Sequence, residues 1–224
     1  MPWLRPWQPK AVQKGDRVAT LLPNCPQMVI VQLAAWKLGC IVAPMNALYT
    51  ERELEQTLNE VGATTVVVLT PFYNKVKSMQ ARTTLRRVIA TNIKEYIPAH
   101  LRVLFTLLKE KKEGHRITLH AEDQWLGDLL RRYAGQAVKA SISPQDPALL
   151  LFTGGTTGSA KAALGTRRSL YIAAAQLHAY EDIRAFCKER RVGYKVPRYV
   201  EFRATLPKTM VGKVLRRELK AEKQ

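Results

Sequence analysis

The order of local patterns in the first half of the chain limits its fold more than any other feature. Stretches with helical spacing alternate with short runs of β-branched and apolar residues, found at 40–46, 64–70 and 86–91. The run at 64–70, "TTVVVLT", is apolar through its centre. Strands of that kind are typical of parallel sheets that helices cover on both faces. The alternation therefore predicts an α/β protein built on a parallel sheet flanked by helices.

Local signals predict where several helices begin and end. The stretch 50–62 opens with Thr50 and carries Glu53 three residues on, which is a capping box, and it closes on Gly62. A proline at position 71 favours the first turn of another helix. The remaining elements that we expect are helices at 26–39, 71–80, 167–180 and 181–191 and a strand at 149–152.

The character of the chain changes near residue 181, where charged helical stretches and a short exposed-type strand follow the α/β pattern. We therefore expect two parts. Residues 1–180 form a partial N-terminal α/β domain, and residues 181–224 form a small α+β C-terminal fragment.

The composition is strongly basic. Thirty-six Lys and Arg stand against 18 Asp and Glu, a formal net charge of +18, which suggests an anionic partner. Solvated basic faces are the simpler interpretation. No helix-turn-helix, zinc-finger or RNA-recognition pattern is present, so no specific nucleic-acid partner is expected. The three cysteines are widely spaced and the four histidines lack ligand spacing, so we expect neither a disulfide framework nor a metal site and favour a reducing cytoplasm.

The stretch 96–112, "YIPAHLRVLFTLLKEKK", allows two interpretations. It is an apolar run followed by lysines, so it fits a basic amphipathic helix lying on an anionic membrane surface. A helix packed on a protein core with a solvated end is the more common case. No run reaches 18 apolar residues, and the N-terminus has no apolar core of a secretory signal. We expect a cytoplasmic protein, with peripheral membrane contact left open.

The stretch 153–161, "TGGTTGSAK", interrupts an apolar run with glycine and threonine and ends on a lysine. Glycines let backbone N–H groups approach an oxyanion, threonine hydroxyls add donors, and lysine adds a positive charge. We expect a loop between a strand and a helix whose N-terminus adds its dipole. It is no Walker A motif, since Ser159 and Ala160 separate the last glycine from the lysine. A plain flexible turn is the alternative. The candidate phosphate-binding residues are Thr153, Gly154, Gly155, Thr156, Thr157, Gly158 and Lys161.

These residues resemble a known signature. "LLFTGGTTGSAKAALGTRRSL" is similar to the phosphate-binding motif of the adenylate-forming, AMP-dependent synthetases and ligases, and Gly154 is most like the long-chain fatty acid–CoA ligases. Ala160 and Ala162 depart from the motif, where Pro and Gly are usual. The stretches 15–68 and 194–219 resemble the N-terminal region and the C-terminal lysine motif of that family.

The resemblance implies an enzyme fold and an activity. It implies the adenylate-forming N-terminal core and an AMP-forming ligase reaction, in which a carboxylic acid is adenylated by ATP and then joined to a thiol. Lys213 corresponds to the lysine that bridges the carboxylate and the α-phosphate, and Lys208 and Gly212 belong to its motif. ATP, Mg²⁺ and CoA are the implied cofactors, and a nucleotide and a fatty acid are the implied partners.

The resemblance is interrupted. Between the expected helix at 167–180 and "YKVPR" at 194–198 we find neither the family's aromatic-Gly-x-Thr-Glu motif, which serves adenine and Mg²⁺, nor its Thr-Gly-Asp motif, which serves ribose. The chain reads as shortened internally and at its N-terminus. Three functions therefore stay open: a ligase, a non-catalytic remnant with at most weak phosphate binding, and a non-specific binder of polyanions or membrane surfaces.

Overall fold

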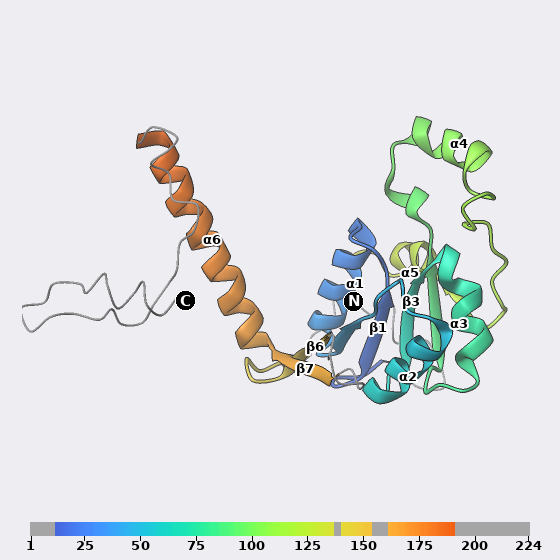
Figure 1. Cartoon of the computed structure of the whole chain (residues 1–224), viewed down its shortest axis with the longest axis horizontal. Helices are drawn as coiled ribbons and strands as arrows, with labels where there is room; N and C mark the ends of the chain where they lie inside the picture. The colour runs from blue at the N-terminus through green and yellow to red at the C-terminus, as the bar shows by residue number, and fades with distance from the viewer. Residues whose placement is uncertain (1–11, 137–139, 154–160, 191–224) are drawn as a thin grey trace, which may run out of the picture. The chain divides into compact units, whose positions relative to one another are not determined.

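The computed structural model describes residues 12–136, 140–153 and 161–190 of the 224, and the chain divides into two compact units, Met1–Ser169 and Leu170–Gln224. The first unit contains the sheet (Figure 1). Its strands are β1 (Arg17–Leu21), β2 (Ile41–Pro44), β3 (Thr65–Leu69), β4 (Arg87–Thr91), β5 (Gln124–Trp125), β6 (Pro147–Thr153) and β7 (Lys161–Thr166).

The sheet has the strand order β5-β4-β3-β1-β2-β6-β7. Strands β1 to β6 are mutually parallel, and only β7 pairs antiparallel, with β6. The predicted parallel sheet flanked by helices is confirmed, with one antiparallel strand added at its edge.

Helices lie on both faces of this sheet (Figure 1). Helices α1 and α5 share one core and α2 and α3 share the other. This division follows from handedness, because right-handed crossovers that run in opposite directions along a sheet place their helices on opposite faces. The helical elements are α1 (Pro26–Lys37), α2 (Glu51–Val61), η2 (Thr70–Phe72), α3 (Tyr73–Gln80), η3 (Ile93–Tyr96), α4 (Ala99–Leu108), α5 (Leu126–Arg132) and α6 (Arg167–Arg190).

Strand β3 shows why an uninterrupted apolar run suits the middle of the sheet. Val67 packs into the core beneath α1 and α5, whereas Val66 and Val68 pack into the core beneath α2 and α3, and all three are at most 1% exposed. Since burial of a valine stabilises the fold by roughly 1.5–3 kcal/mol, both faces of the strand contribute.

The predicted capping box of α2 is confirmed. The Thr50 N–H donates to Glu53 Oε2 at 2.8 Å, and the Glu53 N–H donates to Thr50 Oγ1 at 3.3 Å. These hydrogen bonds lower the pKa of the Glu53 carboxyl. The helix ends at Gly62, whose φ of +60° is the left-handed conformation that glycine accepts readily.

Helix α4 differs from the more common expectation for its sequence. A helix is present within the predicted stretch 96–112, but none of its ten residues is buried. The prediction that this helix packs against a protein core is therefore wrong. Strands β1, β5 and β7 and helix α5 were not among the elements that the sequence patterns predict.

Helix α6 begins at Arg167 and continues for 24 residues, so it includes both helices that the sequence predicts at 167–180 and 181–191. It passes residue 180 without a break, and the domain boundary there stays a prediction. Within the described part of the second unit every characterised side chain is exposed or partly exposed. Among the described helices none combines the length and the low polarity that crossing a bilayer requires.

Candidate functional site

The β6–β7 hairpin joins the two ends of the predicted phosphate loop. Thr153 is the last residue of β6 and Lys161 the first of β7, and their Cα atoms face each other as the final pair of the antiparallel register. Residues 154–160 connect them and lie outside the described residues. Two of the candidate phosphate-binding residues therefore meet at one end of one hairpin.

This end of the hairpin lies at a favourable edge of the sheet. Because β6 runs parallel to β2, Thr153 lies at the carboxyl edge, where strands β1 to β4 also end. Ligands of open α/β sheets usually bind outside the carboxyl ends of the strands. The position of Thr153 is thus consistent with a binding loop.

The structure corrects one part of the predicted loop. The sequence predicts that a helix follows the loop directly, whereas strand β7 intervenes and α6 begins only at Arg167. Small residues permit this pairing, since Gly165 lies opposite Leu149 and a Cβ added there would come within 3.4 Å of the Leu149 Cβ. The prediction that a helix dipole acts directly next to the loop is therefore wrong.

The root of the hairpin is fixed by contacts that come from distant parts of the chain. The Trp36 indole N–H in α1 donates to the Ala148 carbonyl at 2.7 Å. The Asp146 carboxylate pairs with Lys14 at 2.7 Å and accepts a hydrogen bond from the Ser143 N–H at 2.7 Å. The hydrogen bond from Lys14, followed by that from Ser143, lowers the pKa of Asp146. These positioning contacts attach β6 to the rest of the first unit.

Several candidate residues have no described geometry. Gly154, Gly155, Thr156, Thr157 and Gly158, together with Lys208, Gly212 and Lys213, lie outside the described residues. Their roles stay predictions. Among the residues whose placement is described, no group of three or more His, Cys, Asp or Glu side chains is arranged to hold a metal ion.

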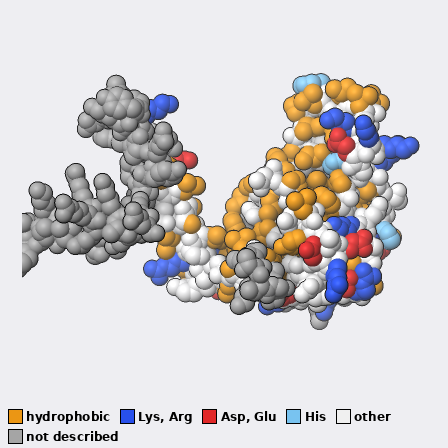
Figure 2. All heavy atoms as spheres, viewed as in Figure 1, with side chains coloured by type: hydrophobic (Ala, Val, Ile, Leu, Met, Phe, Trp, Pro, Cys, Tyr) orange, Lys and Arg blue, Asp and Glu red, His pale blue; other side chains and the backbone are white. Residues whose placement is uncertain are grey.

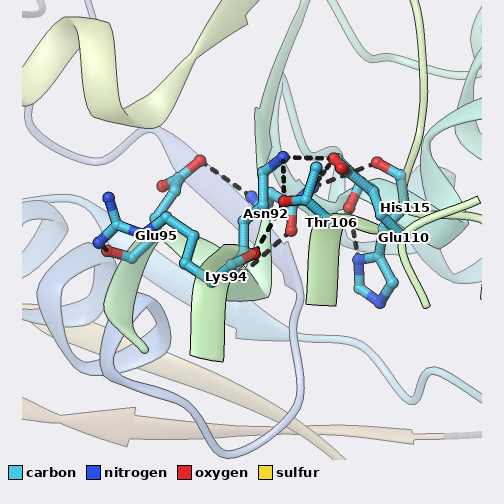
Figure 3. A network of polar contacts seen from close by, with 8 residues as sticks. Asn92, Lys94, Glu95, Thr106, Glu110 and His115 are labelled. Carbon is cyan, nitrogen blue, oxygen red and sulfur yellow. Dashed lines mark hydrogen bonds and ion pairs between the residues drawn. The ribbon is translucent and has the colours of Figure 1, made fainter. Parts of the chain in front are cut away.

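A second polar cluster lies at the base of the β4–β5 connection (Figure 3). Asn92 Nδ2 donates to the His115 carbonyl at 3.2 Å, and Lys94 pairs with Glu110 at 2.5 Å. The Thr70 Oγ1 and His115 Nδ1 share a hydrogen bond of 2.8 Å. Burial lowers the pKa of His115. The cluster holds the segment that carries α4, and local sequence patterns give no sign of it.

The comparisons with known proteins decide the family. A profile of the family described as "AMP-binding enzyme" matches residues 8–203, which is most of the chain. This chain belongs to the AMP-binding enzyme family.

Relatives of this AMP-binding family member are ligases by name. It is 32% identical over 165 residues to the long-chain-fatty-acid–CoA ligase of Bacillus subtilis strain 168, covering 73% of this chain and 30% of that protein. It is also 32% identical over 170 residues to the ligase of the same name from Escherichia coli O157:H7, covering 75% of this chain and 30% of that protein. The chain thus spans about 30% of the length of these curated relatives.

A solved structure supports the fold. The crystal structure of a long-chain-fatty-acid-CoA ligase from Archaeoglobus fulgidus matches 76% of this chain and 29% of that chain, with a TM-score of 0.59 and 26% sequence identity. The resemblance to the core of the adenylate-forming enzymes is therefore confirmed for the family and the fold.

Proposed function

We propose that this AMP-binding family member takes part in the AMP-forming ligation of a long-chain fatty acid to CoA, with the phosphates of ATP held at the β6–β7 hairpin. The observation that carries the proposal is the hairpin register, which sets Thr153 opposite Lys161 at the carboxyl edge of the sheet. The names of the relatives from Bacillus subtilis and Escherichia coli support the substrate class.

The residues of the hairpin suit phosphate. Glycine has no Cβ, so the backbone N–H groups of Gly154, Gly155 and Gly158 can approach phosphate oxygens closely. Threonine hydroxyls add donors, and Lys161 adds a positive charge. Bound ATP supplies an α-phosphate that a carboxylate can attack. Lys213 would stabilise the negative charge that develops there, in the manner of other preorganised electrostatic groups.

A second candidate is a non-catalytic protein that binds phosphate only. It is favoured by the absence of the family's adenine and ribose motifs from the sequence. Binding would then depend on the phosphates alone and would be weak. A general binder of polyanions, suggested by the net charge of +18, is the third candidate.

The test is a product assay on the full chain with MgATP, CoA and a long-chain fatty acid. A ligase produces AMP and acyl-CoA in equal amounts, and the Lys213→Ala variant loses both while keeping the unfolding temperature of the wild type. Absence of both products, in a chain whose unfolding temperature MgATP still raises, would replace the ligase by the non-catalytic phosphate binder.

A further inference from the structure

Helix α4 turns its polar side toward the protein. Arg102 Nη2 donates to the carbonyls of Glu95 and Ile97 at 3.3 and 3.4 Å, and Lys94 Nζ contacts Thr106 Oγ1 at 3.5 Å. Arg102 and Thr106 are four residues apart, so they share one side of the helix. That side therefore faces η3 and the chain beside it.

The apolar side of α4 faces outward. Amphipathic helices of globular proteins normally turn their apolar stripe to the core, and α4 does the opposite. Figure 2 shows hydrophobic side chains gathered over α4, with Lys and Arg side chains beside them. The exposed fractions are 45% for Leu101, 60% for Val103, 52% for Leu104, 76% for Leu107 and 65% for Leu108.

This exposure is built into the fold, because Arg102 holds the first turn of the helix and further contacts hold its C-terminal end. Near its end, the Phe105 ring meets the His115 ring edge-on with centroids 5.2 Å apart. Just beyond the helix, Glu110 pairs with Lys94 at 2.5 Å. His115 in turn forms a hydrogen bond with Thr70. The polar cluster thus fixes α4 with its leucines outside.

The charge around α4 is basic. Between residues 93 and 116 the sequence has six Lys or Arg and three Glu. Two of these acids are neutralised locally, Glu110 by Lys94 and Glu113 by Lys109 at 3.6 Å. In the described part of the chain Lys111, Lys112 and Arg116 take part in no ion pair, and Lys111 and Lys112 follow shortly after the end of the helix at Leu108. The surface therefore favours an anionic partner.

The topology places α4 at one edge of the sheet in the first unit. It belongs to the connection from β4 to β5, and β5 is one edge strand of the sheet. The chain leaves the first unit after β7, which is the opposite edge strand. The connection that carries α4 therefore belongs to the β5 edge of the sheet.

We propose that α4 is a docking helix for an anionic lipid bilayer. Leu104, Leu107 and Leu108 enter the boundary between headgroups and acyl chains, and Lys111 and Lys112 lie against lipid phosphates. A helix with an exposed apolar face and adjoining lysines has the properties of interfacial membrane helices, whose affinity combines buried apolar area with attraction to anionic lipids. If the protein is a ligase as proposed above, the same surface would hold it at the bilayer, into which long-chain fatty acids partition.

Vesicle flotation of the full chain tests the proposal. Vesicles of phosphatidylcholine mixed with phosphatidylglycerol should carry the protein, those of phosphatidylcholine alone should carry much less, and added salt should weaken the binding. The double variant Leu104→Glu, Leu107→Glu should bind at least tenfold more weakly. Both positions are exposed, so circular dichroism and the unfolding temperature should stay as in the wild type.

The matched control changes exposed apolar residues of another helix. Val29 and Leu33 of α1 are 56% and 49% exposed, and Val29→Glu, Leu33→Glu should leave vesicle binding unchanged. Lys111→Glu, Lys112→Glu should reduce the preference for anionic vesicles and the dependence on salt.

Three results would overturn the proposal. The first is equal flotation of the wild type and the Leu104→Glu, Leu107→Glu variant, and the second is that neither protein floats with vesicles. The third is a wild-type dimer in sedimentation that the same double substitution dissociates while vesicles bind neither protein, which would assign α4 to self-association. Vesicle binding is measured without nucleotide, so its failure is distinct from failure of the ligase proposal.

Discussion

The backbone conformation and the surroundings of Gly62 limit which residue can occupy this position. Its φ is +60°, and an added Cβ would lie 2.9 Å from Arg17 Nη1, the atom that donates to the Val61 carbonyl at 2.8 Å. The position therefore needs the left-handed backbone that glycine adopts readily, and a larger residue would also have to displace the Arg17 guanidinium.

We predict that Gly62→Ala lowers the free energy of unfolding by at least roughly 1–2 kcal/mol, the cost of a left-handed alanine. Gly127→Ala in α5 is the control. Its φ is not positive and its Cβ would lie 3.8 Å from the Glu95 carboxylate, so it should stabilise the protein by up to about 1 kcal/mol. Urea denaturation measures both. A Gly62→Ala variant as stable as the wild type would contradict this account.

The lowered pKa of His115 makes the stability of the protein depend on pH. Burial lowers its pKa from the ordinary value of 6.5, while Glu113 and Glu110 act in the opposite direction and Lys94 adds to the lowering. The unfolded chain therefore binds a proton more readily than the folded one. The contribution of neutral His115 to the free energy of unfolding is complete above about pH 6.5 and is lost as the pH falls below that value.

We expect the wild type to lose more unfolding free energy than His115→Gln when the pH falls from about 7.5 to about 5.5. The carboxyl groups titrate in both proteins, so their effect cancels in the difference. Urea denaturation at the two pH values gives the result. Equal losses in the two proteins would show that His115 is not held neutral by the fold.

Local residue signals were predictable, and contacts between distant residues were not. Thr50, Glu53 and Gly62 act within one helix, so their spacing was enough to place both ends of α2. The hydrogen bond from Trp36 to the Ala148 carbonyl joins residues that only the strand order brings together. No spacing along the chain reports such a contact.

Among the elements, strand β7 shows where pattern reading stops. Its residues, Lys161–Thr166, contain alanine, leucine and glycine and only one β-branched side chain. They form a strand because β6 offers an open edge and small residues allow close pairing, so tertiary context outweighs propensity. Strand β1 is the central counterpart, since it pairs with both β2 and β3 although "RVATL" carries a weak apolar pattern.

The attachment of the hairpin to α1 gives a prediction at this scale. Trp36→Phe removes the donor to the Ala148 carbonyl. It should lower the free energy of unfolding by about 1–3 kcal/mol, because the carbonyl loses its hydrogen-bond partner. Amide exchange should speed up in β6 and β7 more than in β3. Trp125→Phe is the control, since in the described part of the chain the Trp125 indole has no hydrogen bond. Uniform acceleration through the sheet would mean that Trp36 does not hold the hairpin.

At the scale of the whole molecule, this family member combines a seven-stranded, mostly parallel sheet with about 30% of the length of its relatives. The sequence predicted the fold class and the family, because the strand–helix alternation and the loop motif are both local. It left open whether the apolar side of α4 faces a core or the outside, because that depends on which side of the helix contacts η3.

The central claim is that the loop between β6 and β7 holds the phosphates of a nucleotide. The first measurement is therefore a thermal unfolding curve of the purified chain, alone, with MgATP and with Mg-tripolyphosphate, beside the Lys161→Ala variant. We predict a cooperative transition that both ligands raise in the wild type and raise less in the variant, since binding to the folded state alone stabilises it. A transition that neither ligand moves would contradict the claim.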